Sequence, residues 1–142
     1  MNFMQVEVNY FGVLLSAVAS MAVGFLWYGQ LFGKQWMKLK GYTAEDLKKE
    51  QKQMGKYYGM SFVLALLTAF VLSHVMTLSM SFFKTSALST GLTTAFWMWI
   101  GFVFTTQTTN TIFGDKKWNL LAIDTGHQLA SLLVMGIVLG ML

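Results

Sequence analysis

The last stretch of the chain, residues 118–142, reads WNLLAIDTGHQLASLLVMGIVLGML and decides the fold class. It is long enough to cross the hydrocarbon core of a bilayer, which takes about 20 apolar residues in a helix. Asp124 and His127 interrupt it three residues apart. On a soluble helix such a pair could lie on the wet face, but inside a bilayer each polar group needs a partner. The pair is therefore either a functional site or a set of hydrogen-bonding groups that stabilises the packing of the helices.

The composition of the whole chain also indicates a membrane protein. Of its 142 residues, 55% are hydrophobic and only 11% are charged, and the mean hydropathy is +0.53. A globular domain has about 25% charged residues. The absence of cysteine excludes disulfides and thiolate chemistry. The net charge of +4 comes from lysines beside the apolar stretches, so it does not predict binding to nucleic acid.

Four apolar stretches predict an all-α integral membrane bundle in a single domain, residues 1–142. The longest polar segment, residues 32–56, is too short for a second domain, and we expect it to be a short helical loop. Within it, Thr43-Ala44-Glu45-Asp46 resembles a capping box. The predicted transmembrane helices are residues 9–31, 57–80, 88–113 and 118–142.

Lysines are distributed unevenly among the predicted loops. Seven of the ten lie in residues 32–56, and Lys116 and Lys117 lie in the third loop, whereas the second loop has only Lys84. The positive-inside rule places both lysine-rich loops in the cytoplasm and both termini outside. These lysines could contact anionic lipid headgroups. A cleaved signal peptide is the competing interpretation of the first stretch, but the tail before it has Glu7 and no basic residue, which favours a retained helix.

Small residues recur every four positions in the predicted spans. Such rows let helix backbones approach closely, which stabilises helix packing in lipid. They do not distinguish packing within one chain from packing between copies, and the faces left over favour a homo-oligomer. The predicted packing residues are Gly12, Ser16, Ser20 and Gly24 in the first span, and Gly136 and Gly140 in the last. Similar rows are Ser61, Ala65, Ala69, Ser73 and Thr77 in the second span, and Gly101, Thr105 and Thr109 in the third.

Several stretches resemble a known family. They read NYFGVLLSAVASMAVGFLWYG (residues 9–29), LFGKQWMKLKGYTAEDLKK (31–49), WMWIGFVFTTQTTNTIFG (97–114) and LLAIDTGHQLASLLVMGIVLG (120–140). Over essentially its whole length the chain resembles the bacterial four-span membrane proteins of domain of unknown function 1761. The most specific motifs are Trp27-Tyr28 leading into Gly33-Lys34-x-Trp36, and Asp124-x-Gly126.

The resemblance implies a small helical protein of the bacterial inner membrane, and it implies no activity. The chain departs from the family's pattern at two places. Gly29-Gln30 stands where members often have a proline after the Trp-Tyr pair. His127 stands where the family often has an aromatic residue, which argues against His127 as a required group.

The polar residues of the last span share one helical face, because Asp124, His127, Gln128 and Ser131 fall at i, i+3, i+4 and i+7. The third span has a counterpart in TTQTTNT, residues 105–111. In a hairpin that turns at residues 114–117, Gln107 would be level with Asp124, and the row at Gly101, Thr105 and Thr109 would allow the two helices to approach. The predicted polar layer consists of Asp124, His127, Gln128, Gln107, Asn110 and Thr106.

A carboxylate at the middle of a transmembrane helix costs roughly 2.5–3.5 kcal/mol on insertion scales. We therefore expect Asp124 to be protonated, open to water, or hydrogen-bonded. The expected partners are Gln107 and Asn110 above all, then the threonines of the third span and His127.

An intramembrane acid is by default a functional hypothesis, here a site for protons, cations or a small polar solute. The first hypothesis is therefore a channel- or transporter-like subunit. The alternative is a non-catalytic accessory protein whose polar layer only holds the bundle together, each bond contributing about 0.6 kcal/mol. An enzyme using Asp124 and His127 is the least favoured, because the sequence has no catalytic motif.

We expect no cofactor and no metal. His74, the other intramembrane histidine, lies on the second span roughly 10 Å in depth from His127, so one metal ion cannot bridge the two. His74 is expected to be a packing partner.

Overall fold

The computed structural model describes residues 6–142, and in this part of the chain every regular element is a helix. Four helical segments are long and apolar enough to cross a membrane. They confirm the predicted all-α fold class and differ from the predicted spans only at their ends. The four segments are Tyr10–Leu31, Met54–Phe83, Ala87–Phe113 and Trp118–Met141.

Two of the four segments combine α-helix with a π-helical stretch. The first consists of α1 (Tyr10–Phe25) and η1 (Leu26–Leu31), and the third of α5 (Ala87–Met98), η2 (Trp99–Phe104) and α6 (Thr105–Phe113). The second and fourth are the α-helices α4 (Met54–Phe83) and α7 (Trp118–Met141). A π-helix has wider turns closed by bonds between residues five apart, and such turns are frequent at functional sites.

The polar segment after η1 contains two short helices rather than one, α2 (Gly33–Lys40) and α3 (Ala44–Gln51). Gly41 ends α2 with a φ of 72°, a left-handed conformation that glycine adopts without strain. The predicted capping box then begins α3: the Thr43 hydroxyl accepts from the Asp46 N–H, and the Asp46 carboxylate accepts from the Thr43 N–H. The backbone bond from Thr43 lowers the pKa of the Asp46 carboxyl.

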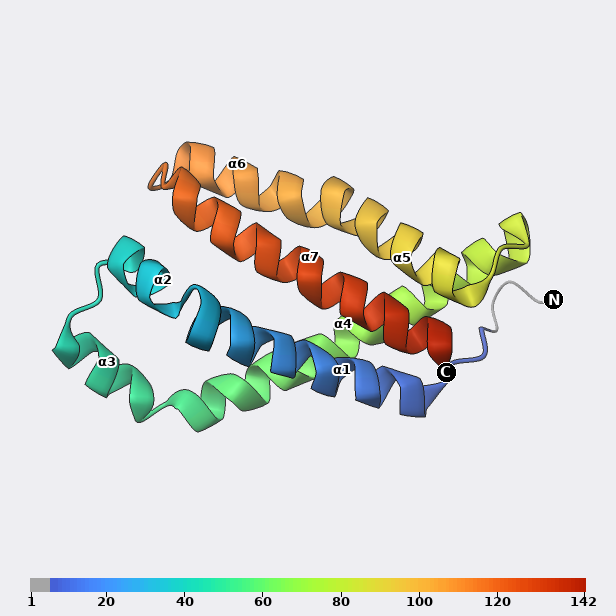
Figure 1. Cartoon of the computed structure of the whole chain (residues 1–142), viewed down its shortest axis with the longest axis horizontal. Coiled ribbons are helices and arrows are strands. Elements are labelled where there is room, and N and C mark those ends of the chain that lie inside the picture. Colours follow the sequence, from blue (N-terminus) through green and yellow to red (C-terminus); the bar gives the residue numbers. More distant parts are fainter. Residues whose placement is uncertain (1–5) are drawn as a thin grey trace.

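The last helix is the central one. In Figure 1, α7 lies between α1 on one side and α5 and α6 on the other, whereas α4 packs mainly against α1 and α5. The core contains many small side chains, and Ala17, Ala69 and Ala95 are all fully buried with Leu72. Small side chains allow close approach of the helices, and this packing is the main source of association energy in lipid.

The predicted small-residue rows of the first and last spans pack inside this one chain. Gly136 lies so close to Gly91 that a Cβ on either residue would collide with the carbonyl group of the other. Ser16 is fully buried and donates a 3.5 Å hydrogen bond to the Met135 carbonyl, which joins α1 to α7. The other predicted packing residues also face neighbours: Gly12 faces Leu139, Gly24 faces His127, and Gly140 faces Ala87 and Leu88. Ser20 lines a pocket described below.

The small-residue row of the third span behaves differently. Gly101, Thr105 and Thr109 are exposed, and no atom lies within 4 Å of a Cβ built at Gly101. The expectation that this row brings α6 close to α7 is therefore wrong. Within α6 the partly buried residues are Gln107, Thr108 and Thr111, whereas Thr105 and Thr109 are turned away from the bundle.

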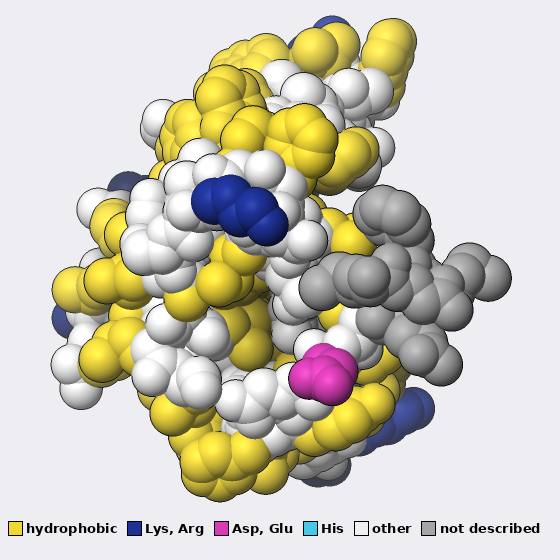
Figure 2. Space-filling view, turned by 90° about the vertical axis from the view of Figure 1, so that its right-hand side faces the viewer, with side chains coloured by type: hydrophobic (Ala, Val, Ile, Leu, Met, Phe, Trp, Pro, Cys, Tyr) yellow, Lys and Arg dark blue, Asp and Glu magenta, His cyan; other side chains and the backbone are white. Residues whose placement is uncertain are grey.

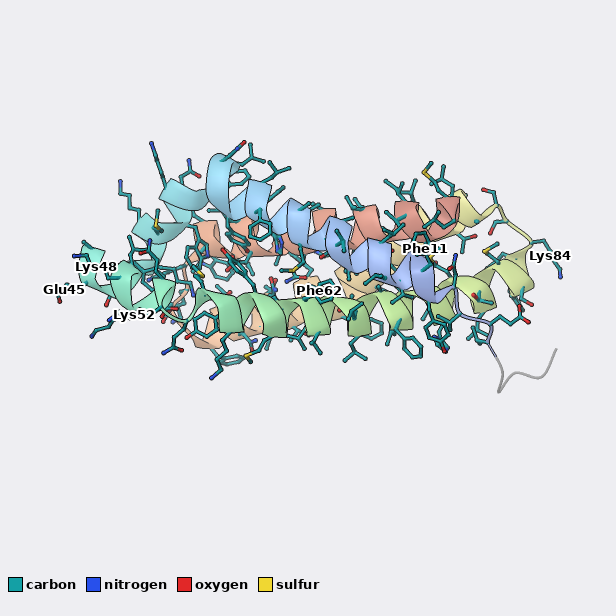
Figure 3. The ribbon with its side chains drawn as sticks, turned by 90° about the horizontal axis from the view of Figure 1, so that it is seen from below. Phe11, Glu45, Lys48, Lys52, Phe62 and Lys84 are labelled. Carbon is teal, nitrogen blue, oxygen red and sulfur yellow. The ribbon has the colours of Figure 1, made fainter. Side chains whose placement is uncertain are left out.

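The two lysine-rich loops lie at the same end of the molecule. The Lys117 ammonium, in the turn between α6 and α7, donates a 2.8 Å hydrogen bond to the Leu39 carbonyl in α2. Figure 3 shows Lys48 and Lys52 at this end and Lys84 at the opposite one. Figure 2, which looks onto the opposite end, shows few charged side chains among hydrophobic and neutral ones. The molecule therefore has one lysine-rich end and one end that is nearly free of charge in the described residues.

Candidate functional site

Asp124 is hydrogen-bonded to a tyrosine of the first span. The Tyr28 hydroxyl donates to Asp124 Oδ1 at 2.6 Å, which is the short range of a bond between a hydroxyl and a carboxylate. The predicted hydrogen-bond partners, Gln107 and Asn110, make no such bond, so this prediction is corrected to Tyr28. The physical reason is that the long Tyr28 side chain extends from η1, at the end of the first span, to Asp124 on α7.

Two tryptophans bind the backbone on either side of Asp124. The indole N–H of Trp27 donates to the Ile123 carbonyl at 2.9 Å, and that of Trp99 donates to the Thr125 carbonyl at 2.8 Å. Trp27 comes from η1 and Trp99 from η2, so both π-helical stretches are directed at the same segment of α7. Trp99 was not predicted from the sequence to be part of this site, and the one signal that the sequence offered is that a partly buried indole N–H needs an acceptor.

The motifs that carry the family resemblance come together at this segment. A Cβ on Gly126 would lie 3.0 Å from the Trp27 ring, and a Cβ on Gly33 would collide with the Tyr28 carbonyl. The Trp36 ring meets the Tyr28 ring edge-on, with centroids 5.6 Å apart. Contact with the backbone therefore requires glycine at Gly33, whereas Gly126 packs tightly against Trp27, and the Trp-Tyr pair is held between α2 and α7.

A polar pocket reaches Asp124 from the lysine-rich end. This α6–α7 pocket has a volume of about 350 Å³. Along α7 its lining runs from Lys117 to Asp124, about 10 Å at the helical rise, so Asp124 lies at the deep end. Gln107 and Asp124, which were predicted to lie at the same level, both line this pocket. Its polar lining includes Gln107, Asn110, Asp115, Lys116, Lys117 and Asp124.

Most of TTQTTNT does not face Asp124. Thr106 is exposed and donates to the Phe102 carbonyl at 2.6 Å, so it lies outside the polar layer in which it was predicted. Thr105 and Thr109 also donate to carbonyls of their own helix, as threonine often does in helices. Gln107 Oε1 and Thr108 Oγ1 are buried without a hydrogen-bond partner among residues 6–142.

His127 faces a second pocket. This α1–α4 pocket has a volume of about 630 Å³ and is walled by α1, η1, α4 and α7, with α2 and α3 at one end. His127 Nε2 is 3.3 Å from the Ser131 hydroxyl, and its Nδ1 is buried without a partner among the described residues. Gln128 and Ser131 line the same pocket. The predicted polar face of α7 is therefore divided between two pockets.

Tyr28 stands between the two pockets. It lines the α1–α4 pocket, and its hydroxyl binds Asp124, which lines the α6–α7 pocket. Its ring packs against the His127 ring with centroids 4.8 Å apart. A single hydrogen bond thus joins a polar group of one pocket to a polar group of the other.

His74 is not part of this site. Its Nδ1 lies 2.9 Å from the Phe70 carbonyl of the same helix, and its ring packs on the Phe70 ring at 4.4 Å. Among residues 6–142, no group of three His, Cys, Asp or Glu side chains is arranged to hold a metal ion.

Four long apolar helical segments, with α7 as the central one, define a multi-pass α-helical membrane protein. The chain belongs to the family described as "Protein of unknown function (DUF1761)", whose model matches residues 11–140. This match covers nearly the whole chain and confirms the family resemblance in its sequence. No curated protein and no solved structure matches the chain.

Proposed function

We propose that the chain is a channel- or transporter-like membrane subunit in which Asp124 and Tyr28 pass protons or small cations between the two pockets. The observation that carries the proposal is the 2.6 Å hydrogen bond between Tyr28 and Asp124, which joins groups that line different pockets. A carboxylate inside a membrane is costly unless it is paired or hydrated. Here one side of Asp124 has a donor and the other has a polar pocket.

In this proposal the hydrogen bond between Tyr28 and Asp124 is the barrier between the two pockets, and protonation of Asp124 opens it. The bond from Tyr28 is strongest when Asp124 is charged, because hydrogen bonds to ions are about twice as strong as neutral ones. A proton that arrives through the α6–α7 pocket neutralises Asp124 and weakens this bond. The Tyr28 hydroxyl, which can both donate and accept, is then free to turn toward the α1–α4 pocket.

Proton flux into proteoliposomes tests this proposal. A potassium gradient with valinomycin sets the membrane potential, and a trapped dye reports internal pH. We expect the unaltered chain to raise proton flux above that of empty liposomes and Asp124→Asn to lose at least tenfold of it. Glu45→Gln, an acidic residue that lines neither pocket, is the control and should retain flux. Undiminished flux in Asp124→Asn would contradict the proposal.

A second candidate is a non-catalytic accessory role in which the polar layer only stabilises the bundle. Three hydrogen bonds converge on residues 123–125, from Trp27, Tyr28 and Trp99, and they favour this alternative. It predicts no proton flux in the unaltered chain and a loss of folded yield in Asp124→Asn. Neither candidate assigns a reaction to Asp124 or His127, and we propose no enzymatic activity.

We also propose that the chain forms a homo-oligomer through the exposed small-residue row of Gly101, Thr105 and Thr109. Rows of this kind let transmembrane helices approach closely, and within residues 6–142 this row is exposed. Because the chain has no cysteine, Thr109→Cys provides a single cross-linking site. We expect it to form disulfide-linked dimers in membranes, whereas Leu64→Cys, exposed on α4, should not. Equal cross-linking of both variants would contradict this interface.

The lysine-rich end is proposed to face the cytoplasm of a bacterial inner membrane, in contact with anionic lipid headgroups. A membrane-impermeant maleimide tests the orientation. It should label Lys84→Cys in intact cells stripped of the outer membrane, and Lys52→Cys only after the inner membrane is broken. The reverse pattern would show the opposite orientation.

A further inference from the structure

We propose that the α1–α4 pocket binds a lipophilic organic cation. The lining combines aromatic rings, a single carboxylate and an apolar interior. The inference concerns ligand binding alone and holds whether or not Asp124 conducts protons. The residues that carry it are Phe25, Tyr28, Trp36, Tyr42, Tyr58 and Glu50.

Aromatic rings form the end of the pocket nearest the lysine-rich loops. Trp36 meets Tyr28 at 5.6 Å and Tyr42 at 5.4 Å, in both cases edge to face. Phe25 and Tyr58 form a second edge-to-face pair at 5.1 Å between α1 and α4. The face of an aromatic ring is electronegative and attracts cations, and cages of such rings bind quaternary ammonium groups. This end of the pocket is therefore suited to a positive charge.

The charged residues of the pocket lining also favour a positively charged ligand. Glu50 is its only carboxylate, and no lysine lines the pocket. Glu50 is partly buried, and none of the side chains in residues 6–142 forms a hydrogen bond or ion pair with its carboxylate. A carboxylate without a partner at the edge of an apolar pocket attracts a cation and repels the phosphate of an anionic lipid.

The rest of the pocket requires the cation to be lipophilic. Its volume of about 630 Å³ is bounded by Met21, Leu64, Leu132 and Met135 as well as the rings. Apolar surface of this kind stabilises a ligand in proportion to the apolar area that it removes from water. A small hydrated cation would leave this surface uncovered, whereas a cation with aromatic or alkyl substituents would cover it.

One cation of the chain itself already lies near this end. The Lys40 ammonium is 5.5 Å from the centroid of the Trp36 ring. The ring therefore attracts a positive charge in the folded protein. Lys40 and a bound cation would repel each other, so removal of the Lys40 charge should tighten binding.

Tetraphenylphosphonium and tetraphenylborate provide the test, because they have the same shape and opposite charge. The full chain in neutral detergent is titrated with each ion by calorimetry, with empty micelles as the blank. We expect saturable binding of one tetraphenylphosphonium per chain and at least tenfold weaker binding of tetraphenylborate. Equal binding of the two ions would overturn the proposal and indicate a merely apolar groove that a lipid chain could fill.

Variants assign the binding to this pocket. We expect Trp36→Leu to weaken tetraphenylphosphonium binding about 5- to 30-fold, the effect of one lost cation–π contact. Glu50→Gln should weaken it about fivefold, as expected for a partly exposed charge pair. Glu45→Gln, on the same helix but outside the lining, should bind as the unaltered chain does, and Lys40→Gln should bind more tightly. Unchanged affinity in both Trp36→Leu and Glu50→Gln would overturn the proposal.

Two further measurements distinguish a variant that does not fold from a result that contradicts the binding proposal. Each variant's thermal unfolding without ligand shows whether it is folded, and Tyr58→Leu offers a second ring on α4 should Trp36→Leu fail to fold. Asp124→Asn should keep tetraphenylphosphonium binding even where it loses proton flux. Loss of binding in Asp124→Asn with an intact fold would contradict the independence of this pocket.

Discussion

The Tyr28 hydroxyl donates a 2.6 Å hydrogen bond to Asp124, 96 residues further along the chain. This bond links the first transmembrane span to the last. It also places Tyr28 between the α6–α7 pocket and the α1–α4 pocket. The same contact therefore joins two spans and lies between two pockets.

Removal of the Tyr28 hydroxyl should destabilise the protein. Tyr28→Phe leaves the ring in place and takes away the donor to Asp124, so we expect a loss of about 1.5–3 kcal/mol, as for other hydrogen bonds to charged groups. Unfolding in mixed micelles measures the change. Tyr57→Phe is the control, because the Tyr57 hydroxyl donates to the side chain of the exposed Gln53. A Tyr28→Phe variant as stable as Tyr57→Phe would show that Asp124 does not depend on this donor.

The two hydrogen bonds from the Trp27 and Trp99 indoles should hold the central segment of α7 in place. Trp27→Phe and Trp99→Phe each remove an N–H donor to the Ile123 or Thr125 carbonyl, which contributes about 0.5–1.5 kcal/mol before any cavity cost. Hydrogen exchange of the amides in residues 121–129 should become faster in both variants. Trp97→Phe, 65% exposed, should leave exchange there unchanged. Unaltered exchange in both test variants would mean that these bonds do not hold the segment.

A methyl group at the crossing of α5 and α7 should not be tolerated. Gly136→Ala places a Cβ against the Gly91 carbonyl, and overpacking of this kind costs about 1–3 kcal/mol. Gly101→Ala adds the same methyl where no atom lies within 4 Å, so it should leave stability nearly unchanged. The melting temperatures of the two variants in detergent make the comparison. Equal values would show that the backbones can separate there without cost.

The start of α3 should depend on pH through Asp46. Its carboxyl has a lowered pKa in the folded chain because the Thr43 N–H binds the charged form. The stabilisation of α3 is therefore present above the ordinary carboxyl pKa of about 4 and is lost as the pH falls through the folded pKa. Carbon chemical shifts of residues 44–51 should report this loss, and Asp46→Asn should abolish the pH dependence. A helix that persists unchanged at pH 2 would contradict the role of the box.

The four spans, the capping box and the small-residue rows were predictable because each depends on residues close together in the sequence. A row such as Ser16 to Gly24 defines a helix face whatever it packs against. The partner of Asp124 was not predictable in this way. Chain order pointed to Gln107 on the neighbouring span, and Gln107 lines the same pocket as Asp124, but Tyr28 provides the donor. The π-helical turn of η1 that brings Tyr28 to α7 leaves no periodic signal in the sequence.

The sequence by itself determined an all-helical membrane protein with a polar face on its last span. Hydrophobic length and periodicity are local properties, and a bilayer admits few ways to satisfy the backbone other than a helix. Only the tertiary structure decided that this face is divided, with Asp124 in one pocket and His127 in another. That division depends on which helices flank α7 and on the Trp27, Tyr28 and Trp99 side chains that reach it from far along the chain. Such long-range contacts follow from the packing of all four spans together.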